Sequence, residues 1–84
     1  MKRTNVTYGQ LDRVLRSLAF SYRLLEDEPP ARVYDHKSGA SIMLPTYPEK
    51  DKVLDYHLAM VQATLDNYGI ADPTVFDAEL QKTG

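Results

Sequence analysis

The stretch that decides the fold is Ala31–Pro45, which reads Ala-Arg-Val-Tyr-Asp-His-Lys-Ser-Gly-Ala-Ser-Ile-Met-Leu-Pro. Strand-forming residues at both of its ends enclose a polar segment, His36–Gly39, in which Gly39 is free to adopt the positive φ of a turn. Pro45 ends the second strand because it has no N–H to donate to a neighbour. The stretch therefore predicts a β-hairpin with a four-residue loop.

A four-residue loop pairs Val33 with Ile42 and Tyr34 with Ser41. Successive side chains of a strand point to opposite faces, so this pairing decides which residues face the core. The two predicted faces are Val33, Ile42 and Leu44 on one side, and Arg32, Tyr34 and Met43 on the other. A two-residue Ser-Gly loop keeps the same faces, whereas a three-residue loop would turn one strand over.

An amphipathic helix is predicted before the hairpin, at about residues 8–19. Thr7 and Gln10 form a capping-box pattern at its start, and apolar residues then recur at helical spacing. Residues 20–25 alternate in polarity and predict a first strand. Its inward-facing residues are Phe20, Tyr22 and Leu24. The prolines and acids of residues 26–30 predict a stiff, solvated connection to the hairpin.

A second helix is predicted after the hairpin, and either Asp51 or Asp55 is expected to cap its start. Its apolar stripe consists of Leu54, Leu58, Val61, Leu65 and Tyr68. Gly69 ends this helix, with Ile70 placed for the apolar contact of a Schellman motif. An Asp-Pro pair at residues 72–73 then opens a short last helix. The residues expected to hold that helix on the body are Val75, Phe76 and Leu80.

This order of elements predicts an α+β, two-layer αβββα fold. It has a three-stranded antiparallel sheet with the helices on one face, plus a short C-terminal helix. The 84 residues form one domain, with a core at about residues 8–70 and a helical extension at 71–84.

The composition excludes several classes of function. The chain contains no cysteine, which excludes disulfides and metal sites built on sulfur. No apolar run is long enough for a membrane span, and no secretory signal follows the first residues, so a cytoplasmic location without membrane contact is expected. The net charge is −2, but residues 1–25 hold five basic residues against one acid. A basic face on the first helix is therefore expected.

The chain has two histidines, His36 in the hairpin turn and His57 beside the apolar stripe of the second helix. Neighbouring residues of a strand point to opposite faces, so an Asp35–His36 dyad is not expected. No second ligand follows His57 at helical spacing, and no phosphate-binding loop is present, so neither a metal nor a cofactor is predicted. Both histidines remain candidates for a functional role.

The arrangement resembles the HicA family of toxin mRNA interferases over about residues 8–70. The resemblance rests on a helix, Ala-Phe entering a strand, a hairpin of the form Val-Tyr-x-His-x-x-Gly-x-x-Ile-x-Leu-Pro, and a helix that ends in Gly-Ile. It implies a fold similar to double-stranded-RNA-binding domains. It also implies a bacterial toxin that cleaves RNA without a metal and is silenced by an antitoxin partner.

The sequence departs from this family at its catalytic residue. The family has Gly-Ser-His before the Val-Tyr pair, where this chain has Pro29-Pro30-Ala31, and alanine cannot transfer a proton. The sequence therefore predicts an RNA-binding, HicA-like domain without nuclease activity. Two alternatives remain open: an active interferase that uses His36 or His57 instead, and a protein-interaction module with no role in RNA binding.

Arginines supply the predicted RNA contacts. Arg13 and Arg16 are three residues apart, so they share one face of the first helix, which contacts the duplex in the double-stranded-RNA-binding fold. Arg23 and Arg32 are expected together on the outer face of the sheet, where an exposed Tyr34 would stack on a base. The full predicted set is Arg13, Arg16, Arg23, Arg32, Tyr34 and Lys37. An antitoxin-like protein is the other expected partner, and no DNA contact is expected.

Overall fold

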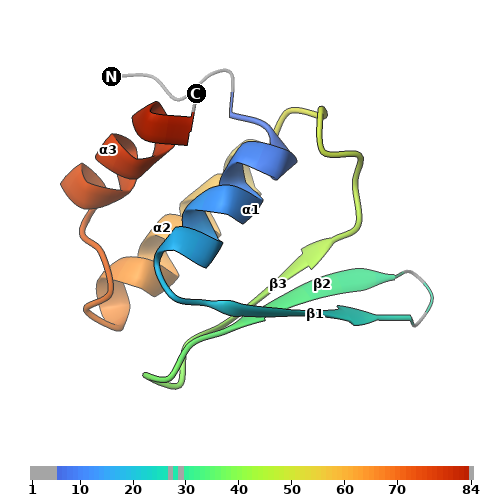
Figure 1. The fold of residues 1–84 in the computed structure, drawn as a ribbon, viewed down its shortest axis with the longest axis horizontal. Coiled ribbons are helices and arrows are strands. Elements are labelled where there is room, and N and C mark those ends of the chain that lie inside the picture. Colours follow the sequence, from blue (N-terminus) through green and yellow to red (C-terminus); the bar gives the residue numbers. More distant parts are fainter. Residues whose placement is uncertain (1–5, 27, 29, 84) are drawn as a thin grey trace.

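Three antiparallel strands form one sheet, and three helices pack on a single side of it (Figure 1). The computed structural model describes residues 6–26, 28 and 30–83. The elements are α1 (Tyr8–Ser17), β1 (Ser21–Leu25), β2 (Ala31–Asp35), β3 (Ser41–Pro45), α2 (Asp55–Asn67) and α3 (Pro73–Thr83). The sheet order β1-β2-β3 follows the chain, which confirms the predicted αβββα order with an added C-terminal helix.

Parts of two predicted segments lie outside the described residues. They are Asp27 and Pro29 of the predicted connection at residues 26–30, and Gly84 of the predicted extension at residues 71–84. Residues 1–5 also lie outside the described part. Within the described part of the chain, no helix is long and apolar enough to cross a membrane.

Local signals determine where α1 and α3 begin. The Thr7 hydroxyl accepts a hydrogen bond from the Gln10 N–H at 3.1 Å, and the Gln10 side chain accepts one from the Thr7 N–H at 3.4 Å. This is the predicted capping box. At the start of α3 the Asp72 carboxylate accepts from the Val75 N–H at 2.9 Å, as expected for an N-cap followed by proline.

The second helix ends as predicted but begins differently. The Ile70 N–H donates to the Leu65 carbonyl at 2.9 Å, which is the longer bond of a Schellman motif. At the other end the N-cap is Leu54, and no side chain caps it. The predicted caps Asp51 and Asp55 were wrong, because Asp51 precedes the N-cap by three residues and Asp55 already lies inside the first turn.

The pairing of the hairpin differs by one residue from the predicted one. Tyr34 pairs with Ile42, and Val33 pairs with Met43. The reason is the loop, which comprises the five residues 36–40 instead of four. Since strand side chains alternate, one added residue turns a whole strand over relative to its neighbour.

Two backbone hydrogen bonds close this longer loop. The His36 N–H donates to the Ala40 carbonyl at 2.9 Å, and the Gly39 N–H donates to the His36 carbonyl at 2.9 Å. Gly39 has a φ of 100°, a conformation that a residue with a Cβ rarely adopts. The predicted turn glycine is thus confirmed, although the loop that it closes has a different length.

The new register changes which side chains face the helices. Tyr34 faces them and is buried, and Arg32 lies on the same face of β2. Arg23 lies on the opposite, open face, so the prediction that Arg23 and Arg32 share a face was wrong. Val33 belongs to the open face but is still only 2% exposed, because it lies on the central strand between Arg23 and Met43.

Five residues predicted to be buried are partly or largely exposed. One is Leu54, the N-cap of α2, which is 43% exposed. Tyr22 and Leu24 do lie on the helix side of the sheet, but they are 36% and 52% exposed because β1 is an edge strand that the helices cover only partly. Tyr68 lies just beyond the last residue of α2 and is 50% exposed, and Val75 on α3 is 43% exposed.

The third helix lies beside α1 and contributes to the same core (Figure 1). The Gln10 side chain donates to the Leu80 carbonyl at 2.7 Å, and the Ser17 hydroxyl donates to the Glu79 carboxylate at 3.2 Å. Phe76 and Leu80 are both buried. Residues of the C-terminal segment are therefore part of the apolar interior.

We predict that Leu65→Ala lowers the free energy of unfolding by about 2–5 kcal/mol, because Leu65 is fully buried and its truncation leaves a cavity. Met60→Ala on the same helix is the control, since Met60 is 36% exposed and its loss should cost much less. Denaturant unfolding of both variants measures the difference. Equal midpoints for the two variants would contradict the packing described here.

Candidate nucleic-acid interface

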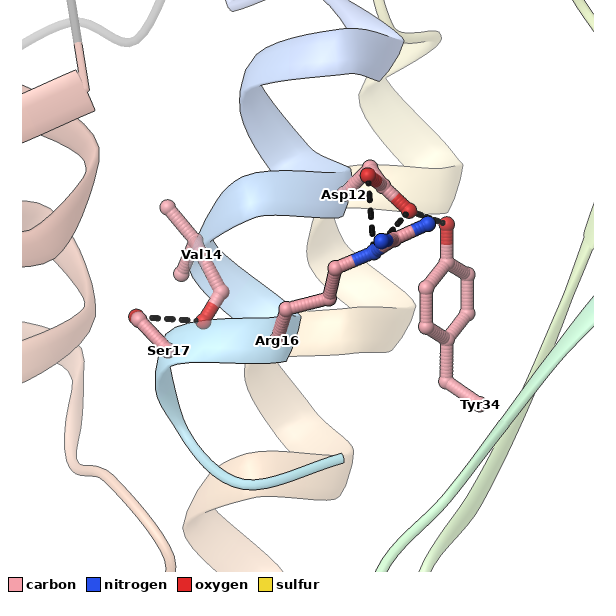
Figure 2. Close-up of polar contacts among 5 residues, drawn as sticks. All are labelled: Asp12, Val14, Arg16, Ser17 and Tyr34. Carbon is pink, nitrogen blue, oxygen red and sulfur yellow. Dashed lines mark hydrogen bonds and ion pairs between the residues drawn. The ribbon is translucent and has the colours of Figure 1, made fainter. Parts of the chain in front are cut away.

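A polar cluster joins α1 to the helix side of the sheet (Figure 2). The Tyr34 hydroxyl on β2 donates to the Asp12 carboxylate on α1 at 2.6 Å. The same carboxylate accepts from Arg16, one helical turn further on, whose Nε lies 3.1 Å from its second oxygen. One acid therefore holds both a buried phenol and a surface arginine.

Two arginines from different elements meet at one aromatic ring. The guanidinium carbon of Arg16 lies 4.7 Å from the centre of the Tyr22 ring, and that of Arg32 lies 5.8 Å from it. Both distances are within the range of cation–π attraction. The Tyr34 ring also packs against Tyr22, with centroids 5.6 Å apart. The result is a cluster of Asp12, Arg16, Tyr22, Arg32 and Tyr34, named here the arginine cluster.

Arg32 contributes an unused hydrogen-bond donor to the arginine cluster. Its Nε is buried, and no acceptor among the described residues lies within hydrogen-bond distance of it. A buried donor without a partner is uncommon in folded proteins and calls for an explanation. Burial lowers the pKa of Arg32, but the nearby Tyr34 oxygen and Asp12 carboxylate raise the pKa by more, so the group stays a cation.

Tyr34 has a structural role in the arginine cluster. Burial, and then its hydrogen bond to Asp12, raise the pKa of the Tyr34 hydroxyl, which therefore stays protonated and donates to the carboxylate. Its ring is only 1% exposed. The prediction of an exposed Tyr34 that stacks on a base was wrong, because the hairpin register turns this side chain toward α1.

The other predicted RNA-contacting residues lie at three separate places. Arg13 is exposed on α1 and makes no ion pair within the described part of the chain. Arg23 pairs with Asp35 at 2.9 Å on the open face of the sheet. This ion pair, together with a hydrogen bond that the Ser41 hydroxyl donates to Asp35, lowers the pKa of the Asp35 carboxyl. Lys37 is exposed at the tip of the hairpin.

His36 lies in the hairpin loop and makes contacts that order the loop. Its Nδ1 accepts from the Ser38 N–H at 3.0 Å, and its ring packs on Phe20 with centroids 5.0 Å apart. Asp35 instead contacts Arg23 and Ser41, so no bond links it to His36. This arrangement agrees with the expectation that the two residues do not form a dyad.

His57 is buried among tyrosines at the start of α2. The Tyr8 hydroxyl lies 3.0 Å from its Nδ1 and is assigned as the donor, because the oxygen already accepts from the Leu54 N–H at 3.3 Å. The rings of Tyr47 and Tyr56 pack on the same imidazole. Burial lowers the pKa of His57. Among the described residues, no group of three metal-ligating side chains converges here or elsewhere.

Sequence reasoning missed three contributors. Asp12 was not predicted as a site residue, although its spacing of four from Arg16 is a signal for an ion pair. Tyr22 was assigned to the core because of its alternation with polar neighbours. The contact between Tyr8 and His57 joins residues 49 positions apart, and no local pattern indicates it.

Comparison with models of protein families, with curated proteins and with solved structures finds no match to this chain.

We predict that Tyr34→Phe lowers the free energy of unfolding by about 1–2 kcal/mol, because it removes a hydrogen bond to a charged group that is only 15% exposed. Tyr22→Phe is the matched control, since its hydroxyl makes no hydrogen bond within residues 6–26, 28 and 30–83. Tyr22→Phe should change the free energy of unfolding by no more than about 0.5 kcal/mol. Chemical denaturation measures both values, and equal losses would refute the role assigned to the Tyr34 hydroxyl.

We also predict that stability falls as the pH drops below about 6.5, the usual pKa of histidine. Burial lowers the pKa of His57 in the folded state, so the unfolded chain takes up a proton before the folded chain does. The loss grows until the pH reaches the lowered folded-state pKa and is absent above the usual value. Denaturant unfolding between pH 5 and 8 measures it.

The control for this pH dependence is the other histidine. His57→Gln should reduce the change in stability between pH 7 and pH 5, whereas His36→Gln should leave the contribution of His57 in place. A wild-type pH profile that is unchanged in His57→Gln would show that His57 is not responsible.

Proposed function

We propose that this protein is a small RNA-binding domain, similar to the HicA family but without its nuclease activity. The observation that carries the proposal is the convergence of Arg16 and Arg32 on Tyr22, with Asp12 as the one acid that contacts them in the described part of the chain. The arginine cluster thus holds an excess of positive charge on a chain whose net charge is −2.

Stacking on a ring leaves a guanidinium able to bind phosphate. The cation–π contact uses the flat face of the group, while its N–H donors point outward in the plane. Arg16 uses its Nε on Asp12 and is 54% exposed. Arg32 is half-buried and its Nε is buried, so only the rest of its guanidinium can meet a phosphate. With exposed Arg13 on the same helix, three cations are available for RNA phosphates.

Two features support the absence of nuclease activity. Ala31, which aligns with the catalytic histidine of the HicA family, is the first residue of β2 and offers no group for proton transfer. Of the two histidines that could replace it, His57 is buried and only 6% exposed, so its imidazole is shielded from an RNA backbone. An interferase with a relocated histidine is therefore the weaker candidate. A bacterial, cytoplasmic location and an antitoxin-like partner belong to this proposal.

A protein-interaction module is the second candidate, and the open face of the sheet favours it. No helix in the described part of the chain covers that face (Figure 1). Met43 is 57% exposed there, next to the apolar Val33 of the central strand. This face has one cation, Arg23, and Asp35 neutralises its charge. It suits a protein better than a phosphate backbone.

The test is the affinity for a short RNA hairpin at several salt concentrations. Contacts with about three phosphates predict a slope of log affinity against log salt of roughly −2 to −3. Arg13→Gln combined with Arg16→Gln should weaken binding and make the slope of log affinity against log salt less negative by about 1.5, because two counterion-releasing contacts are lost. Denaturing gels of the same mixtures should show intact RNA, with and without a chelator.

The matched control is Arg23→Gln, which removes one positive charge from the opposite face of the sheet. It should leave the salt slope nearly unchanged. If it weakens binding as strongly as the double variant, the open face is the interface instead. Wild-type protein without salt-sensitive binding would exclude the RNA proposal and favour a protein partner.

A further inference from the structure

A pocket lies where the chain between β3 and α2 packs against the first turn of α1. Its volume is about 180 Å³, and its lining residues are Tyr8, Tyr47, Asp51, Lys52 and Leu54. The chain before α2 approaches α1 closely at Gly9, whose N–H donates to the Glu49 carbonyl at 2.9 Å. A glycine is needed there, because a Cβ on residue 9 would lie only 3.0 Å from Glu49 Cβ. The pocket and the arginine cluster have no residue in common.

The aromatic wall of the pocket is held in place. The Tyr8 hydroxyl contacts His57 Nδ1 at 3.0 Å and the Leu54 N–H at 3.3 Å, so both its donor and its acceptor capacity are used internally. The Tyr8 ring packs against Tyr47 with centroids 4.9 Å apart. Tyr8 is only 5% exposed, so the ring surface open to a ligand belongs mainly to the half-buried Tyr47, and Tyr8 supports that ring from behind.

The charged residues of the pocket have no partner of their own. Asp51 and Lys52 are exposed neighbours, and neither side chain makes an ion pair or hydrogen bond within the described residues. A carboxylate accepts two hydrogen bonds side by side, and an ammonium only donates. A ligand that suits this pair has two adjacent donors next to an acceptor, on a flat ring system.

We propose that this pocket binds a guanine base. Its N1–H and N2–H groups would donate to the Asp51 carboxylate, its O6 and N7 would accept from the Lys52 ammonium, and its face would pack on the half-buried Tyr47 ring. The pocket has a volume of about 180 Å³ and is open to solvent, so one edge of a base can lie in it while the rest of the nucleotide stays outside. The inference rests on the proposed RNA-binding function and names the base that an unpaired nucleotide would present.

Hydrogen-bonding patterns distinguish guanine from the other bases. Adenine has a donor where guanine has O6, and no N–H at N1. Cytosine offers a single exocyclic donor, and uracil has one N–H between two carbonyl acceptors. Neither presents two adjacent donors to a carboxylate.

The test uses nucleosides, which lack phosphate, at a salt concentration that suppresses RNA binding. Titration by NMR of the wild-type protein should show guanosine binding about tenfold tighter than adenosine, with shifts at Tyr8, Tyr47 and Asp51. Asp51→Asn should abolish this preference, because the amide offers one acceptor and one donor. Glu49→Gln is the matched control, since Glu49 precedes the pocket by two residues without lining it, and it should retain the preference.

The outcomes separate this inference from the proposed function. Equal binding of all nucleosides, no binding, or a guanosine preference that survives Asp51→Asn would overturn the guanine pocket. If RNA binding is still weakened by the Arg13→Gln and Arg16→Gln double variant, the proposed function stands alone. Guanosine binding that disappears in Asp51→Asn supports the pocket, whatever the salt dependence of RNA binding.

Discussion

The hydrogen bond between the Tyr34 hydroxyl and the Asp12 carboxylate, 2.6 Å long, is the contact on which the rest of the arrangement depends. It joins the central strand to the first helix, and its charged acceptor makes it stronger than a neutral pair. Asp12 also binds Arg16, so the same contact positions the cation that lies over Tyr22. The contact in turn requires the five-residue hairpin loop, since a loop shorter by one residue would turn Tyr34 away from the helix.

The first helix positions both candidate sites. Tyr8, Asp12 and Arg16 are each four residues apart, so they follow one side of α1 from its first turn to its last. Tyr8 forms a wall of the pocket, and Arg16 belongs to the arginine cluster. Contacts to phosphate position a nucleic acid without reading its sequence, whereas contacts to a base edge read it. The proposed sites divide these two tasks between the ends of one helix.

Signals that act over a few residues predicted the elements well. The capping box at Thr7, the Asp-Pro start of α3 and the Schellman end of α2 all involve partners fewer than six positions apart. Side-chain environment was harder to predict. Tyr34 and Arg32 were assigned to the outer face because the loop length was misjudged by one residue, and Tyr22 proved to be partly exposed because the helices leave the edge strand incompletely covered.

The sequence by itself determined the order of helices and strands and the ends of most helices, because propensity, capping and periodicity are local properties. Only the tertiary structure decided which charges meet. Arg16 of α1 and Arg32 of β2 both contact Tyr22, whereas Arg23 lies on the other face of the sheet. The Tyr8 hydroxyl contacts His57, which is 49 positions away in the sequence. Such contacts depend on the register and on packing between distant segments, and no short pattern in the chain encodes either.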